Sequence, residues 1–243
     1  MLPDMDWDAI IQAYPHDADQ IMQAKELVKH VDSVLVLLEI PDLGNCREPT
    51  GAKQLIPIQP LSEACKTAWK NFFGNEPPWD IQASLAKFFA EDAQPDDIPE
   101  EQRDAAGIII RAAITGYLKR LLERNRTLLP ENWNEGKCAF CSTYPRIAFD
   151  SETSRTMFCP LCGYSWKFPR IKCPFCNNTD FHTLGYFETD GIAHVRVYFC
   201  RECSCYIKSV DTHEYRAFDA ETENVLSLEM DLLAKQEGFK EIA

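Results

Sequence analysis

The feature that most constrains this 243-residue chain is a series of four Cys-x-x-Cys pairs between residues 138 and 203. The pairs are Cys138/Cys141, Cys159/Cys162, Cys173/Cys176 and Cys200/Cys203. Eight thiolates are enough for two tetrahedral four-sulfur metal sites. Proline follows the first cysteine of the second and third pairs, and Gly163 or Asn177 follows the last, where a tight turn often needs a positive φ. These features are typical of metal-binding knuckles rather than of a redox-active helix.

The lengths of the gaps between the pairs predict how the cysteines group. The gaps hold 17, 10 and 23 residues, in chain order. A zinc ribbon or rubredoxin needs a hairpin or a small sheet between its knuckles, which only the two longer gaps accommodate. We therefore expect one metal on Cys138, Cys141, Cys159 and Cys162, and another on Cys173, Cys176, Cys200 and Cys203. Ligands shared across the two groups remain the alternative, because spacing alone fixes connectivity poorly. Cys205, just past the last knuckle, is expected not to bind metal.

The sequence predicts reduced cysteines and a soluble, cytoplasmic protein with no membrane insertion. Residues 1–16 contain three Asp and no Lys or Arg, so they lack the basic region of a secretory signal. The longest uncharged apolar run, Val34 to Leu38, is too short for a bilayer. A disulfide framework is therefore a weaker explanation for the cysteines than metal binding.

The distribution of charge bears on the kind of partner. The chain has a formal net charge of −13, divided as −10 over residues 1–136, +2 over 137–216 and −5 over 217–243. Two bound Zn²⁺ or Fe³⁺ ions with eight thiolates would leave the cysteine region neutral or slightly acidic. A nucleic-acid-binding ribbon usually has a basic patch, so this balance argues against DNA or RNA as the partner.

Residues 1–136 have the apolar spacing of a helical domain followed by a linker. Helices are predicted over Asp17–Ile40, over Leu61–Phe73 with a possible cap at Ser62 and a stop at Gly74, over Trp79–Ala90, and from about Pro99 to Arg126. The acidic stretch Glu91–Glu101 is predicted to be a loop. A further helix is predicted over Glu221–Phe239, with Gly238 as its C-cap.

The cysteine region itself has an internal repeat. An arginine lies four residues before the second and fourth knuckles, as Arg155 and Arg196, and an alternating strand pattern follows each. The two halves therefore look like copies of one design. Aromatic residues are frequent in both halves, and we expect them to fill small cores that about 35 residues cannot otherwise build.

These motifs resemble the formate dehydrogenase accessory protein (FdhE-type) family. The resemblance covers about residues 137–240 and depends on the order and spacing of Cys138-Ala-Phe-Cys141, Cys159-Pro-Leu-Cys162-Gly-Tyr-Ser-Trp166, Arg170-Ile-Lys-Cys173-Pro-Phe-Cys176 and Cys200-Arg-Glu-Cys203-Ser-Cys-Tyr-Ile-Lys208. The stretch from Met230 to Phe239 is similar to the C-terminal helix of that family. Asn177 stands where glycine is common, a departure that a positive-φ turn tolerates.

The resemblance implies an α+β protein: a helical domain (1–136), two rubredoxin-like or zinc-ribbon modules (137–170 and 171–216) and a C-terminal helix (217–243). It implies a cytoplasmic assembly factor for a molybdenum- or tungsten-dependent formate dehydrogenase, which binds the catalytic subunit of that enzyme. It also favours iron over zinc, a choice that four sulfurs alone do not make.

Five residues near the knuckles match the family pattern and are predicted to bind the partner: Trp166, Arg170, Arg196, Tyr206 and Lys208. Arg and Trp are typical anchors of protein interfaces, and we expect the five to face a common groove between the modules. The alternatives are a rubredoxin-type electron carrier and a zinc-ribbon nucleic-acid-binding module. Thiol oxidoreductase chemistry is disfavoured because no thioredoxin-like βαβ pattern surrounds the cysteines, so we expect no enzymatic activity.

Overall fold

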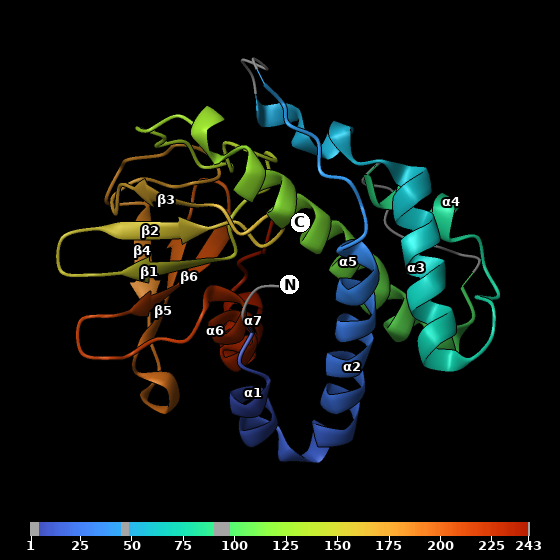
Figure 1. The fold of residues 1–243 in the computed structure, drawn as a ribbon. Coiled ribbons are helices and arrows are strands. Elements are labelled where there is room, and N and C mark those ends of the chain that lie inside the picture. Colours follow the sequence, from blue (N-terminus) through green and yellow to red (C-terminus); the bar gives the residue numbers. More distant parts are fainter. Residues whose placement is uncertain (1–4, 45–48, 90–97, 243) are drawn as a thin grey trace. The chain divides into compact units, whose positions relative to one another are not determined.

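The computed structural model describes residues 5–44, 49–89 and 98–242. The chain divides into two compact units, one of residues 1–47 and 51–127 and the other of residues 48–50 and 128–243 (Figure 1). Each unit has its own core and is described by itself. Within the described residues, no helix is both long and apolar enough to cross a membrane.

The first unit is helical. Its α-helices are α1 (Trp7–Ala13), α2 (Ala18–Leu35), α3 (Ile58–Phe73), α4 (Ile81–Phe89) and α5 (Arg103–Arg124), with 3₁₀ turns at Pro15–Asp17, Pro49–Leu55, Glu100–Gln102 and Arg126–Leu128. The apolar faces of α2, α3 and α5 form a core that includes Leu27, Val31, Leu61, Trp69, Ile109, Ile114 and Leu118. α5 is buried along most of its length, because helices pack on more than one of its sides.

The helix ends follow local chemistry. Asp6 caps α1, since its Oδ1 accepts the amide of Ala9 at 2.9 Å. Gly74 ends α3 in the left-handed conformation at φ 73°, as the sequence predicts. Ser62, by contrast, lies inside α3 rather than at its N-cap, because the helix begins one turn earlier at Ile58. Most of the predicted acidic loop lies outside the described residues.

The second unit is built on one six-stranded sheet. Its strands are β1 (Ile147–Asp150), β2 (Arg155–Phe158), β3 (Ser165–Phe168), β4 (Leu184–Phe187), β5 (Val195–Cys200) and β6 (Cys205–Asp211), in the order β3-β2-β1-β6-β5-β4. Neighbours are antiparallel except at the centre, where β1 and β6 run parallel with Ile147 opposite Lys208. Each half of the sheet therefore contributes an antiparallel meander.

The two halves repeat the same order of parts. Each consists of a knuckle, two strands, a second knuckle and a third strand, with β1, β2 and β3 in the first half and β4, β5 and β6 in the second. The internal repeat in the sequence thus corresponds to a repeated supersecondary unit. The sequence did not predict that the two copies join through β1 and β6 into a single sheet.

Two C-terminal helices pack on one face of this sheet, which we call the helix-covered face. They are α6 (Ala220–Leu226) and α7 (Leu228–Gln236), and Asp219 caps α6 by accepting the amides of Glu221 and Thr222. Their apolar partners form a buried cluster of Ile147, Val195, Val197, Tyr206, Val210, Met230 and Ala234. Because side chains alternate along a strand, the neighbouring positions occupy the opposite face, which we call the second face.

The single helix predicted over Glu221–Phe239 is interrupted at Ser227. The buried ammonium of Lys208 donates to the carbonyl oxygens of Asn224 at 2.8 Å and Ser227 at 3.3 Å. These carbonyls are satisfied by a side chain from the sheet, so the helix can break there at little cost. The last helix ends at Gln236, three residues before the predicted end, and Gly238 follows its cap residue Glu237 with a φ of 88°.

Candidate metal centres

Four turns of nearly identical shape carry the cysteine pairs. The residue after the second cysteine has a positive φ in every turn: 59° at Ser142, 74° at Gly163, 62° at Asn177 and 56° at Ser204. In the first three turns the amide of that residue donates to the carbonyl of the first cysteine, at 3.0 to 3.1 Å. The sequence predicted this backbone for Gly163 and Asn177 but gave no such signal for the two serines, which rarely adopt it.

The turns bring the cysteines together in two groups of four: Cys138, Cys141, Cys159 and Cys162, and Cys173, Cys176, Cys200 and Cys203. These are the two sets that the gap lengths favour. Within each group all sulfur atoms lie within 4.8 Å of one another. The Cys138–Cys162 and Cys141–Cys159 sulfur distances are 3.5 and 3.3 Å. In the second group, Cys173–Cys203 and Cys176–Cys200 are each separated by 3.7 Å.

These distances fit a tetrahedral metal ion. Four sulfurs at about 2.3 Å from a Zn²⁺ ion lie about 3.8 Å from one another, whereas a disulfide needs about 2.05 Å. The cysteines of both groups are free. The amides of Phe140 and Phe175 point at the sulfurs of Cys138 and Cys173, each at 3.4 Å. Each group can therefore hold one metal ion, and a four-sulfur site suits iron and zinc alike.

Burial and hydrogen bonds change the acidity of the thiols in the first group. Burial raises the pKa of Cys159 and of Cys162 well above its ordinary value. Hydrogen bonds from Cys138 and the other cluster thiols hold the pKa of Cys141 well below it. Without a metal, the first group cannot ionise all four thiols, because buried like charges repel. A divalent or trivalent ion supplies the opposite charge.

The second group is more accessible than the first. All four cysteines of the first group are buried, whereas Cys176 is exposed and Cys203 is half-buried. Burial tends to raise the pKa of Cys200, but hydrogen bonds from the Asn178 side chain and from backbone amides lower it to about 7. The two sites therefore have the same donor atoms but different access to solvent.

Cys205 lies outside both groups. It is buried at the start of β6, and its thiol donates to the carbonyl of Cys203 at 3.2 Å. In the repeat, the position two residues after the second knuckle is Tyr164 in the first copy and Cys205 in the second. Both side chains are buried there, so Cys205 fills the place of a core residue.

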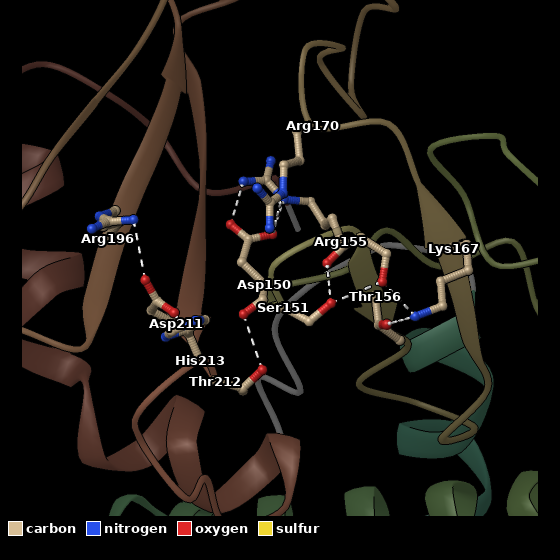
Figure 2. Close-up of polar contacts among 11 residues, drawn as sticks. Asp150, Ser151, Arg155, Thr156, Lys167, Arg170, Arg196, Asp211, Thr212 and His213 are labelled. Carbon is tan, nitrogen blue, oxygen red and sulfur yellow. Dashed lines mark hydrogen bonds and ion pairs between the residues drawn. The ribbon is translucent and has the colours of Figure 1, made fainter.

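The repeated arginines each pair with a carboxylate of their own half. Arg155 binds Asp150 through two hydrogen bonds of 2.8 Å, and both side chains are buried. Arg196 binds Glu188 at 2.9 Å. It also binds Asp211 at 3.4 Å (Figure 2). Burial tends to raise the pKa of Asp150, but the Arg155 guanidinium outweighs it and lowers the pKa. Asp150 lies opposite Asp211 across the β1–β6 seam, so each copy neutralises its own charge there.

The five residues predicted to bind a partner do not share one groove. Trp166 and Arg196 lie in one cross-strand row, with Met157, Ala148 and Ser209 between them, on the second face. Tyr206 and Lys208 project to the opposite, helix-covered face, where Tyr206 belongs to the apolar cluster and Lys208 reaches α7. The expectation of a common groove is therefore wrong, because strand alternation separates the residues.

Burial separates the five further. Trp166 is buried and its indole N–H donates to the carbonyl of Glu135 at 2.9 Å. Tyr206 donates to Asp231 at 2.8 Å, and the Lys208 ammonium binds the same carboxyl at 2.7 Å. These three side chains hold the second unit together. Only Arg170 and Arg196 are partly exposed, at 43% and 34%.

The fold and the site define a class: an α+β protein with a helical unit, a six-stranded sheet carrying two four-cysteine groups, and C-terminal helices. Residues 171–243 match the family model "FdhE, C-terminal domain". The chain is 29% identical over 114 residues to the Protein FdhE homolog of Aquifex aeolicus (strain VF5), covering 45% of this chain and 40% of that protein. It is 27% identical over 139 residues to the Protein FdhE homolog of Proteus mirabilis (strain HI4320), covering 54% of this chain and 45% of that protein.

A solved structure extends the likeness of fold to nearly the whole chain. The crystal structure of the FdhE protein from Pseudomonas aeruginosa matches with a TM-score of 0.65 and 18% identity, over 97% of this chain and 91% of that one. At this identity the match concerns the fold alone. The matched regions span less than half the length of the two curated relatives. The C-terminal part of the chain is thus similar to the FdhE C-terminal domain, and the fold of nearly the whole chain is similar to that of a solved FdhE protein.

Proposed function

We propose that this protein is an accessory factor in the maturation of a molybdenum- or tungsten-dependent formate dehydrogenase, and that it acts in the cytoplasm by binding the catalytic subunit. The observation that carries the proposal is the match of residues 171–243 to the FdhE C-terminal domain, which includes one complete four-cysteine group. The likeness to FdhE homologues supports an accessory role.

In this proposal the eight cysteines bind two metal ions whose role is to hold the fold. Iron is favoured by the resemblance to the family, and zinc fits the same donors. The cysteine turns join strands of four to seven residues, and a metal ion bound by two turns would hold those turns together. The halves 137–170 and 171–216 would then be metal-stabilised copies that share one sheet. In the sequence they follow the helical domain 1–136 and precede the C-terminal segment 217–243.

The partner-binding role falls on the exposed cations. Arg170 and Arg196 are partly exposed on or beside the second face, whereas Trp166, Tyr206 and Lys208 support them from within. Arginine is a frequent interface anchor because its planar guanidinium makes paired hydrogen bonds.

A pull-down with the immature catalytic subunit tests the function. We expect the metal-loaded full chain to capture the subunit, and Arg170→Ala/Arg196→Ala to reduce capture at least about tenfold. The control Lys167→Ala/Lys235→Ala removes two exposed cations elsewhere and should behave as wild type. Undiminished capture by the arginine variant would show that Arg170 and Arg196 do not bind the subunit. No capture by wild type would refute the function.

The exposure of the second cysteine group favours a second candidate, a rubredoxin-type electron carrier. Cys176 is exposed, so an iron ion there would be close to solvent and to a redox partner. This candidate requires a visible iron–sulfur spectrum and a reversible reduction potential in the purified protein. Protein that contains only zinc after iron-replete expression would exclude it.

A further inference from the structure

A cavity of about 180 Å³ opens between the second face of β4, β5 and β6 and the segment 170–175. Its walls include Tyr198 of β5 and Tyr186 of β4, whose rings lie 5.5 Å apart. The Arg155 guanidinium lies 4.0 Å from the centre of the Tyr198 ring and forms part of the wall. We call this space the anchor cavity.

The size of the anchor cavity limits what it can hold. Small-molecule and cofactor pockets usually measure about 300 to 1,000 Å³. An apolar cavity of about 150 Å³ is known to hold a single benzene ring. At about 180 Å³, the anchor cavity matches one aromatic side chain better than a cofactor.

The rim of the cavity is unusually apolar for a protein surface. Ile171, Phe181 and Tyr186 all line it, and they are 66%, 69% and 56% exposed. Large apolar side chains gathered at one exposed place typically mark an interaction site. The rim therefore offers apolar contact to residues on either side of an inserted ring.

The rim also carries two cations, Arg170 and Lys172. Arg170 lies 3.9 Å from Asp150 (Figure 2). Both oxygens of that carboxylate already accept hydrogen bonds from Arg155, one from Nε and one from Nη2. Lys172, also in the lining, donates a long 3.4 Å bond to the carbonyl of Asn134, and its ammonium lies 5.4 Å from the centre of the Phe168 ring.

In the described part of the chain, the residues lining the cavity include no Asp or Glu. Cys173 and Cys200 also line the cavity and are negative when they hold a metal ion. The preference for a carboxylate therefore depends on Arg170 and Lys172, whose side chains are at least partly exposed at the rim.

We propose that the anchor cavity binds an aromatic side chain of a partner polypeptide, and that a neighbouring carboxylate of the same segment pairs with Arg170 and Lys172. The proposal deepens the proposed function, on which it rests for the identity of the partner as a protein. The cavity makes the apolar contact with the aromatic ring. Pairing of the carboxylate with Arg170 and Lys172 fixes the orientation of the bound segment.

The direct test uses a fluorescein-labelled peptide, Gly-Ser-Phe-Glu-Phe-Glu-Ser-Gly, with the full, metal-loaded chain. We expect saturable binding by fluorescence anisotropy. Replacing Glu by Gln, or Phe by Ala, in the peptide should each weaken binding about tenfold. Arg170→Gln and Phe181→Ala in the protein should do the same, because one charged hydrogen bond or one apolar contact is lost. Lys167→Gln, a cation on β3 outside the cavity lining, should leave binding unchanged.

The outcomes separate this inference from the proposed function. If wild type captures the dehydrogenase subunit but Phe181→Ala and Arg170→Gln capture it equally well, the cavity is not the docking site and the function stands. No binding of the peptide by wild type, or binding indifferent to its glutamates, would also overturn the inference. Equal binding of free phenylacetate would identify a small-molecule site instead. Metal content of each variant, measured in parallel, shows that the fold is retained.

Discussion

At the scale of single residues, the second unit depends on buried polar groups whose partners come from other elements. Lys208 is the clearest case: its side chain is 1% exposed, and it binds Asp231 and two helix carbonyls. Arg155 is buried in the same way against Asp150. Breaking such a pair leaves one charge without a partner, which is costly in a protein interior.

We predict that Lys208→Met lowers the free energy of unfolding by about 3 to 5 kcal/mol at pH 7, because the buried carboxylate of Asp231 loses its cationic partner. Burial lowers the pKa of Lys208 below its ordinary value, despite the nearby Asp231. The folded state therefore loses its proton at a lower pH than the unfolded state, and wild-type stability gains a contribution as pH rises toward about 10.4. The gap between wild type and variant should widen as the pH rises toward about 10.4. A constant or narrowing gap in denaturant titrations would contradict this.

The cysteine pair Cys203 and Cys205 provides a matched comparison. Cys205→Ser should leave the metal content at two ions per chain, because its sulfur donates to a carbonyl instead of joining the group of four. Cys203→Ser should lose one ion, since it removes a ligand. Elemental analysis of reduced protein decides between them. Loss of an ion from the Cys205 variant would mean that the fourth ligand is misassigned.

At the scale of elements, the sequence predicted most of what local chemistry determines. Gly74 required a helix stop, and the spacing of the pairs favoured the two groups of cysteines. The break at Ser227 could not be predicted, because the group that satisfies the carbonyls there is Lys208, which lies on a strand. The separation of Lys208 from Arg196 on opposite faces also depends on strand register, which the sequence showed only as alternation.

Two glycines of α5 test how closely its neighbours pack. A Cβ at Gly116 would lie 2.6 Å from Cδ1 of Leu35, a buried residue of α2, whereas a Cβ at Gly107 would meet nothing within 4 Å. Gly107→Ala should stabilise the protein by about 0.5 to 1 kcal/mol through helix propensity. Gly116→Ala should instead cost a net of about 1 kcal/mol, because overpacking outweighs that gain. Equal stabilisation by both, measured by thermal unfolding, would show that α2 and α5 are loosely packed.

At the scale of the whole molecule, two metal sites with the same donors differ in access, and this sets the order of metal loss. We predict that a chelator removes the metal of the second group at least about tenfold faster, because Cys176 is exposed and the first group is fully buried. Cys138→Ser should leave a single ion that is released quickly, and Cys173→Ser a single ion that is released slowly. Time courses with a colorimetric chelator measure both. The opposite order would mean that opening of the fold, and not static exposure, limits release.

The division into two units predicts which part of the chain loses stability when metal is removed. Both groups of cysteines belong to the second unit, while the helical unit has a core of its own. Because the proposed ions belong to the second unit alone, we expect their removal to destabilise the sheet and to leave the core of the helical unit in place.

The parallel seam between β1 and β6 has a geometric consequence. The first strand of one copy lies beside the third strand of the other, so the copies are related by displacement along the sheet and not by a two-fold axis. A displacement, unlike a rotation by half a turn, does not close on itself. The outer strands β3 and β4 are again a third and a first strand, the kind that meet at the seam. The first strand of a further copy can pair with β3, and the third strand of a further copy can pair with β4, as β1 pairs with β6 at the seam. The sheet can therefore in principle be extended at either edge. Outer strands of only four residues each offer a short template for such growth.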